Sequence, residues 1–168
     1  NVTPGYWRQP ETTAASFDEE GYYRLGDAVR WIDERDVERG LMFDGRIAED
    51  FKLSSGTWVS VGPLRARLLS ALNPFAQDVV IAGLNRDELG ILIFPDWGAC
   101  ADFLGVDAGS PRDGWPLARL REEIGRRLQR HNDSHPGGST TVRRALLQLE
   151  PPSLDKGEVT DKGSINQR

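Results

Sequence analysis

The order of apolar patterns after residue 60 constrains the fold of this chain more than any other sequence feature. Apolar residues recur at helical spacing from 61 to 72, which predicts an amphipathic helix, and Asn73-Pro74 is expected to end it. Two short apolar runs at 78–83 and 90–94 predict a pair of strands, because a polar turn separates them. A helix followed by two strands is therefore expected here.

Two further helices are predicted downstream. Pro95-Asp96 is expected to begin a helix that carries Trp97, and a loop rich in Gly, Asp and Pro follows it over 105–114. Apolar residues at helical spacing between 117 and 128 then predict a second amphipathic helix, whose other face is rich in Arg and Glu.

A last strand completes the pattern. It is expected over 140–148, with Val142, Leu146 and Leu147 as its buried members. Helix, two strands, two helices and a strand predict an α+β fold, a small domain with a three-stranded sheet flanked by helices.

The first 44 residues have a different pattern from the residues after 60, because their apolar runs are short. We expect a helix at 11–17, strands at 22–24, 28–33 and 41–43, and a solvated charged loop between the last two strands. Such short strands cannot enclose a core alone. They are expected to be the trailing edge of a larger domain, or a small flap.

Composition narrows the class of protein. A net charge of −5 gives no support to nucleic-acid binding, and no apolar run approaches the roughly 18 residues of a membrane span. The single Cys100 excludes an internal disulfide framework and fits a reducing compartment, so a cytoplasmic protein is expected. His131 and His135 have no Cys and no close acidic pair beside them to complete a metal site, and are interpreted as surface or capping groups.

The stretch FDGRIAEDFKLSSG, residues 43–56, concentrates groups suited to ligand binding. Gly45-Arg46 is expected to turn the chain, residues 49–53 to form a half-buried strand, and Ser54-Ser55-Gly56 a tight turn. The planar charged fork of Arg46 suits hydroxyls or phosphate oxygens, and Gly56 allows a ligand to approach the backbone.

Three motifs around this stretch carry a resemblance. GYW at 5–7 with PET at 10–12 and Phe17, the run GYYRLGD at 21–27, and GEVTDKG at 157–163 occur in the order of adenylate-forming enzymes. The chain resembles the C-terminal part of an AMP-forming acyl-CoA synthetase, closest to feruloyl-CoA synthetase. The chain lacks a starting Met and begins inside a motif, so a fragment of a longer protein is expected.

The resemblance implies two nucleotide-binding residues and a hinge. Asp27 would accept hydrogen bonds from the ATP ribose hydroxyls, and Arg46 would contact the ribose or phosphates. The hinge residue of such enzymes, two after this Arg, is Asp or Lys, whereas this chain has Ala48. The hinge is therefore expected to use backbone torsions near Ala48, or to transfer its polar role to Glu49. The implied domains are the tail of a large adenylation domain at 1–44, a hinge at 45–50, and a lid at 51–168.

The thiol-transfer face is implied downstream of the hinge. Lys52 would approach the adenylate or the thiol, and Ser55 and Gly56 belong to the loop that would line the pantetheine channel. Trp58 is a second candidate for a channel wall, although a Trp on a strand is more often a core residue.

The catalytic lysine is implied near the chain end. Lys162 would stabilise the negative charge that spreads over the α-phosphate during adenylation. Relatives usually have Gly-Lys followed by Ile, whereas here Gly163 follows the lysine, so Lys156 is kept as the rival. The basic cluster of Arg126, Arg127, Arg130, Arg143 and Arg144 is interpreted as a solvated face, with contact to coenzyme A phosphates as the alternative.

The implied enzyme activates a carboxylic acid as its acyl-adenylate and transfers it to coenzyme A. The resemblance to feruloyl-CoA synthetase suggests a hydroxycinnamic acid such as ferulic acid. ATP, Mg²⁺ and coenzyme A would be bound mainly by the N-terminal domain, so this fragment alone is expected to be inactive. Two alternatives stay open: a non-catalytic α+β binding module that uses the arginine face, or an adenylating enzyme that loads a carrier protein.

Overall fold

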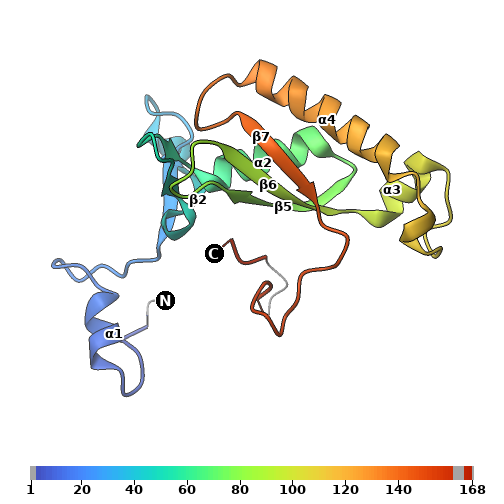
Figure 1. Ribbon diagram of the computed structural model, residues 1–168. Helices are drawn as coiled ribbons and strands as arrows, with labels where there is room; N and C mark the ends of the chain where they lie inside the picture. The colour runs from blue at the N-terminus through green and yellow to red at the C-terminus, as the bar shows by residue number, and fades with distance from the viewer. Residues whose placement is uncertain (1–2, 161–164, 168) are drawn as a thin grey trace. The chain divides into compact units, whose positions relative to one another are not determined.

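The computed structural model describes residues 3–160 and 165–167. The chain divides into two compact units, Asn1–Ala48 and Glu49–Arg168 (Figure 1). Among the described residues, no helix combines the length and apolar character that crossing a bilayer requires.

The first unit is built on one antiparallel hairpin. Strands β1 (Asp27–Trp31) and β2 (Leu41–Arg46) pair with each other, after the short helix α1 (Pro10–Ala15). The charged loop between them contains the 3-10 turn η1 (Val37–Arg39), and η2 (Ile47–Glu49) follows β2. The predicted helix and the two later strands are therefore present.

Two local predictions for this unit are wrong. Residues 22–24 form no strand, and only Tyr23 makes an isolated antiparallel bridge, with Phe17. Gly45 and Arg46 do not turn the chain, since both belong to β2. Gly45 takes a φ of 104°, a value that glycine tolerates without a steric penalty, so the strand continues through it.

The first unit leaves much apolar surface exposed. Trp7, Val29 and Phe43 are all exposed, with Phe43 62% accessible, and none of the residues of α1 is buried. A two-stranded hairpin has too few strands to bury such side chains between its own layers. This unit does not build a core of its own within the described residues.

A helix whose first N–H is capped forms one wall of the core of the second unit. In α2 (Val61–Leu72), the predicted apolar stripe is buried at Val61, Leu64, Leu68 and Leu72, and Leu69 is partly buried against the core. The Asp50 carboxylate accepts a hydrogen bond from the Val61 N–H at 2.8 Å, which satisfies a donor that the helix itself leaves unpaired.

The sheet of this unit is three-stranded and mixed, with the order β5-β6-β7 (Figure 1). Antiparallel β5 (Ala76–Ala82) and β6 (Leu89–Pro95) form a hairpin, and β7 (Val142–Leu147) pairs with β6 in parallel. A separate two-stranded ladder joins β3 (Phe51–Lys52) to β4 (Trp58–Val59). The predicted α+β class with a three-stranded sheet is confirmed.

Two more helices complete the core. The Asp96 carboxylate accepts a hydrogen bond from Ala99 N at 3.0 Å and caps α3 (Trp97–Leu104), as the position of Pro95-Asp96 predicts. A loop with the 3-10 turn η3 (Arg112–Gly114) leads to α4 (Leu117–Ser134), whose apolar stripe is buried.

Leu146 corrects the prediction for the last strand. Val142 is buried and Leu147 packs against the core, but the Leu146 side chain is 58% exposed. Successive side chains of a strand point to opposite faces, so Leu146 and Leu147 cannot both face the core.

Part of the basic cluster has a structural role. Buried Glu123 forms ion pairs with Arg126 and Arg127 on the same helix, and Arg127 also donates a hydrogen bond to the Asn73 carbonyl beyond α2. The hydrogen bond from Arg127 is the main reason that the pKa of Glu123 is lowered. The interpretation of a simply solvated face is therefore wrong for Arg127, which connects α4 to the end of α2.

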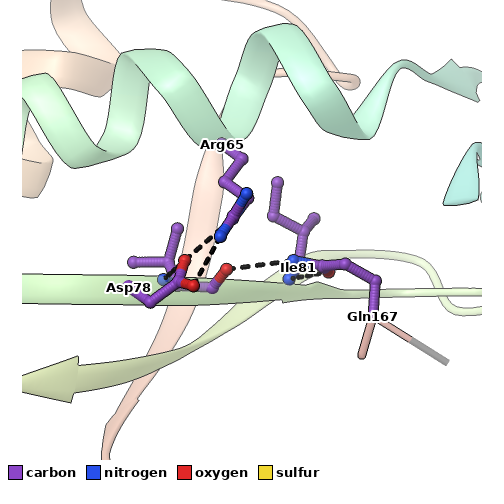
Figure 2. A network of polar contacts seen from close by, with 5 residues as sticks. Arg65, Asp78, Ile81 and Gln167 are labelled. Carbon is purple, nitrogen blue, oxygen red and sulfur yellow. Dashed lines mark hydrogen bonds and ion pairs between the residues drawn. The ribbon is translucent and has the colours of Figure 1, made fainter. Parts of the chain in front are cut away.

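The chain end docks on the open edge of β5 (Figure 2). The Gln167 amide accepts from the Ile81 N–H at 3.0 Å and donates to the Val79 carbonyl at 3.0 Å, so it pairs like one residue of an additional strand. On the same strand, Asp78 forms an ion pair with Arg65 of α2. The tail and α2 are thus both fastened to β5.

Candidate functional site

Asp27 and Arg46 are cross-strand partners in the β1–β2 ladder. Asp27 opens β1 and Arg46 closes β2, and the Ile47 N–H donates to the Gly26 carbonyl at 2.9 Å just beyond them. Directly opposed residues of an antiparallel pair share one face of the ladder. The hairpin therefore brings together the two residues that the sequence singled out for nucleotide binding.

The side chains of Asp27 and Arg46 are both accessible to a ligand. Within residues 3–160 and 165–167, neither the Asp27 carboxylate nor the Arg46 guanidinium makes an ion pair or a side-chain hydrogen bond, and both residues are exposed. Asp44, a possible partner of Arg46, instead pairs with Arg30 at 3.2 Å. An acceptor and a cationic fork on one exposed face suit a ligand that carries both hydroxyls and phosphate.

The segment after Arg46 joins the two units. Ala48 and Glu49 lie in η2, and the boundary between the units passes between them. The next residue, Asp50, is committed to capping α2. The side chain of Ala48 offers no polar group, so its use as a hinge stays a prediction about backbone torsion.

Ser54-Ser55-Gly56 forms the tight turn that the sequence predicts. The Gly56 N–H donates to the Leu53 carbonyl at 2.9 Å, and the Ser55 and Thr57 hydroxyls lie 2.9 Å apart. Gly56 has a φ of 81°, where a residue with a Cβ is strained. No described atom lies within 4 Å of the place where that Cβ would sit, so the backbone of Gly56 is open to a ligand.

Lys52 and Trp58 face each other beside this turn. They are cross-strand partners between β3 and β4, and the Lys52 Nζ lies 5.8 Å from the centroid of a Trp58 ring. Trp58 is 49% exposed, so the expectation of a core residue is wrong; its neighbour Val59 takes the buried position on the opposite face. Together they present a cation and an aromatic surface to solvent.

The turn between β5 and β6 forms hydrogen bonds with the end of β3 and with this loop. The Asn85 N–H donates to the Lys52 carbonyl at 3.1 Å, the Ser54 N–H donates to the Arg86 carbonyl at 3.0 Å, and the Ser54 hydroxyl donates to the Asp87 carboxylate. Sequence reasoning identified residues 85–88 only as a turn. No local signal could reveal these contacts, because the partners are more than 30 residues apart along the chain.

The two candidate lysines of the tail differ in whether the structure describes them. Lys162 lies outside the described residues, so its catalytic role stays a prediction. Lys156, its rival, is exposed. Val159 and Ile165 form an isolated antiparallel bridge, and the Asn166 N–H donates to the Glu158 carbonyl at 2.8 Å.

The two histidines are stacked, with ring centroids 4.8 Å apart. His131 is buried and its Nε2 lies 3.2 Å from the Thr140 carbonyl, so the surface assignment was wrong for this residue. His135 does serve as a cap, because its Nδ1 lies 3.1 Å from the His131 carbonyl. In the described part of the chain, no group of three or more His, Cys, Asp or Glu side chains is arranged to hold a metal.

Comparison with known proteins gives relatives that are adenylate-forming enzymes. The chain is 26% identical over 163 residues to a carboxylic acid reductase of Segniliparus rugosus, covering 96% of this chain and 12% of that protein. It is 34% identical over 100 residues to fatty acyl-CoA synthetase A of Dictyostelium discoideum, covering 58% and 14%. It is 36% identical over 85 residues to a 3-hydroxybenzoate/4-hydroxybenzoate–CoA ligase of Thauera aromatica, covering 51% and 15%. No family model matches the chain.

Solved structures share the fold. The adenylation domain of carboxylic acid reductase from Segniliparus rugosus, in complex with AMP and a carboxylic acid, matches with a TM-score of 0.71 at 24% identity, over 98% of this chain and 24% of that one. The adenylation domain of a Mycobacterium chelonae carboxylate reductase matches with a TM-score of 0.72 at 24% identity, over 96% and 23%. The chain thus spans a quarter or less of these relatives, and has the fold of the corresponding fragment of an adenylation domain.

Proposed function

We propose that this chain is the C-terminal part of an ATP-dependent enzyme that activates a carboxylic acid as its acyl-adenylate and transfers the acyl group to a thiol. The observation that carries the proposal is the pairing of Asp27 with Arg46 on one exposed face. The exposed apolar side chains of the first unit support it, because they suit burial against a preceding domain.

In the first step, the substrate carboxylate attacks the α-phosphorus of ATP and pyrophosphate leaves. Asp27 accepts hydrogen bonds from the ribose hydroxyls, and Arg46 contacts the ribose or phosphates. We assign Lys162 the charge that develops on the α-phosphate, since a cation placed there stabilises the transition state more than the ground state. Among the described residues, no group of three or more His, Cys, Asp or Glu side chains is arranged to hold a metal, and we derive no step through Mg²⁺.

In the second step, the unit that begins at Glu49 turns about residues 45–50 and presents its other face. A thiolate attacks the acyl carbon, the tetrahedral intermediate collapses, and AMP leaves. Lys52 lies close to the reacting groups in this arrangement, and the thiol arm passes the open backbone of Gly56 beside Ser55. Trp58 forms a wall of the same passage.

Coenzyme A is the acceptor that we favour, and an aromatic acid of the hydroxycinnamate type is the substrate. The wording of residues 43–65 supports this choice through its resemblance to feruloyl-CoA synthetases. The relative that acts on hydroxybenzoates, by its name, supports an aromatic acid in general.

A second acceptor has support of its own. The similarity to carboxylic acid reductases extends over nearly the whole chain, and a further relative is named as a ligase for acyl-carrier protein. We therefore keep a carrier-protein thiol as the alternative acceptor. The binding-module alternative is weaker, because Arg126, Arg127 and Arg144 are already paired with Glu123 and Glu88.

The test is Lys162→Ala in the complete protein that contains this chain, with the two half-reactions assayed separately. A selective loss of pyrophosphate exchange, with transfer from added acyl-adenylate retained, supports the assignment. Adenylation at the wild-type rate refutes it. Lys156→Ala tests the rival, since a selective loss of exchange in that variant would assign the role to Lys156 instead. Coenzyme A and a phosphopantetheinylated carrier protein, offered in parallel, decide the acceptor.

A further inference from the structure

The β3–β4 loop, to which we assign thiol passage, is hydrogen-bonded to the β5–β6 turn, which is outside all of the sequence motifs. Residues Gly83 to Glu88 link β5 to β6, and they contact the β3–β4 loop through both backbone and side-chain groups. The two segments are distant in sequence, so these contacts form only in the folded domain. The loop therefore depends on this turn for its position.

Two backbone hydrogen bonds hold the chain where it leaves β3. The Asn85 N–H donates to the Lys52 carbonyl, and the Ser54 N–H donates to the Arg86 carbonyl. Asn85 has a φ of 56°, the left-handed conformation that Asn tolerates better than most residues. The N–H of Asn85 thus bonds to the last residue of β3, and the carbonyl of Arg86 bonds to the turn that follows it.

Side-chain packing adds a second constraint. A Cβ on Gly83 would meet a methyl group of Leu53 at 3.2 Å and the Glu88 carbonyl at 3.0 Å, so the turn and Leu53 are in close contact. Leu53 is buried and directly precedes the turn at Ser54. Buried Leu53 thus fixes the start of the loop in the core.

One contact lies at the loop itself. The Ser54 hydroxyl donates to the Asp87 carboxylate, which is a hydrogen bond to a charged acceptor and so stronger than a neutral one. Without it, the loop would keep its backbone hydrogen bonds to the turn but lose the side-chain hydrogen bond between Ser54 and Asp87. Ser55 and Gly56, which follow at once, would then be free to shift.

We propose that Asp87 is a positioning residue for the thiol-transfer step, acting through Ser54 on the Ser55–Gly56 passage. The inference rests on the proposed function. Asp87 belongs neither to the nucleotide-binding pair nor to the tail, so it is expected to affect the second half-reaction alone. Orientation effects of this kind are large, since a shift of about 1 Å can cost about 100-fold in rate.

The experiment compares Asp87→Ala, Asp87→Asn and Glu88→Ala in the complete protein. Glu88 is the matched control: it is an exposed carboxylate on the same turn, but it pairs with Arg144 rather than with the loop. Pyrophosphate exchange measures adenylation. Single-turnover transfer from preformed acyl-adenylate, over a range of coenzyme A or carrier-protein concentrations, measures the second step.

We expect Asp87→Ala to slow transfer at saturating thiol by about 10-fold, as a partial loss of orientation would, and to leave adenylation within about 2-fold. Asp87→Asn should restore most of the rate, because its side-chain oxygen still accepts from Ser54. Ser54→Ala should reproduce the defect, and the double variant should be no slower than either single one.

Three results would overturn the inference. They are transfer by Asp87→Ala at the wild-type rate, equal slowing of both half-reactions, or an equal defect in Glu88→Ala. If Asp87→Ala does not fold, Ser54→Ala decides alone, with the same expected and contrary results. Failure of the wild-type protein to form any acyl-adenylate refutes the proposed function itself. This result differs from the three above, so failure of the inference and failure of the proposed function can be told apart.

Discussion

Asp27 and Arg46 lie directly opposite each other at the open end of the β1–β2 hairpin. The end of the GYYRLGD motif and the Arg of the stretch at 43–56 thereby lie on one exposed face. In the proposed function, Asp27 would contact the ribose of ATP and Arg46 the ribose or phosphates from the same face. The pairing turns two separate sequence signals into one testable site.

Removing either member of this pair should weaken nucleotide use. We expect Arg46→Ala to raise the KM for ATP by at least about 10-fold, because a hydrogen bond to a charged group contributes about 1.5–3 kcal/mol. Arg46→Lys should rescue little, since the planar fork is lost. Arg30→Ala is the control, as Arg30 lies on the same hairpin but pairs with Asp44. An equal rise in KM for Arg30→Ala would contradict the assignment.

A side chain at Gly56 should harm the loop without any clash. We expect Gly56→Ala to lower the free energy of unfolding by about 1–2 kcal/mol, because its φ of 81° is strained for alanine. Thiol transfer should fall as well. Gly125→Ala is the matched control: it has free space and lies in helix α4, so it should stabilise by about 0.5–1 kcal/mol. Urea unfolding measures both, and an unaffected Gly56→Ala would show that the turn tolerates another φ.

The Gln167 contact should protect the edge of the sheet (Figure 2). Gln167→Ala removes two hydrogen bonds to β5, and at about 0.5–1.5 kcal/mol each this loss should speed exchange of the Ile81 amide hydrogen about 10-fold. Gln129→Ala, which removes an exposed contact to Asp133 on α4, should leave that amide unchanged. Hydrogen exchange followed by NMR resolves the two. Wild-type protection of Ile81 in Gln167→Ala would mean that the tail does not dock in solution.

Burial of His131 should make stability depend on pH. Desolvation is the main cause that lowers its pKa below 6.5; nearby His135 and Arg67 also lower it, whereas the contact with Thr140 raises it. The unfolded chain then binds the proton more readily than the folded one, so stability falls as the pH drops below 6.5. We expect His131→Gln to flatten the dependence of the unfolding free energy on pH between about 7 and the lowered pKa.

The lowered pKa of Glu123 adds a separate effect. Its folded form also resists protonation, so its contribution is lost as the pH falls below 4.5. Urea titrations that stay above that value isolate the histidine. An unchanged slope in His131→Gln would show that another group carries the dependence.

The sequence by itself determined the local elements of the second unit. Helix α2, the β5–β6 hairpin, the Asp96 cap of α3 and the turn at 54–56 follow from periodicity and from capping or turn residues. Each depends on residues close together in the chain, so the pattern contains the information. The resemblance to adenylate-forming enzymes followed from motif order in the same way.

Only the tertiary structure decided which side chains meet. Strand alternation placed Leu146 and Trp58 outward, and the packing of α4 buried His131. The pairing of Asp27 with Arg46 and the hold of Asp87 on Ser54 both need contacts between distant segments. Local patterns cannot encode such contacts, because register and packing are set by the whole domain at once.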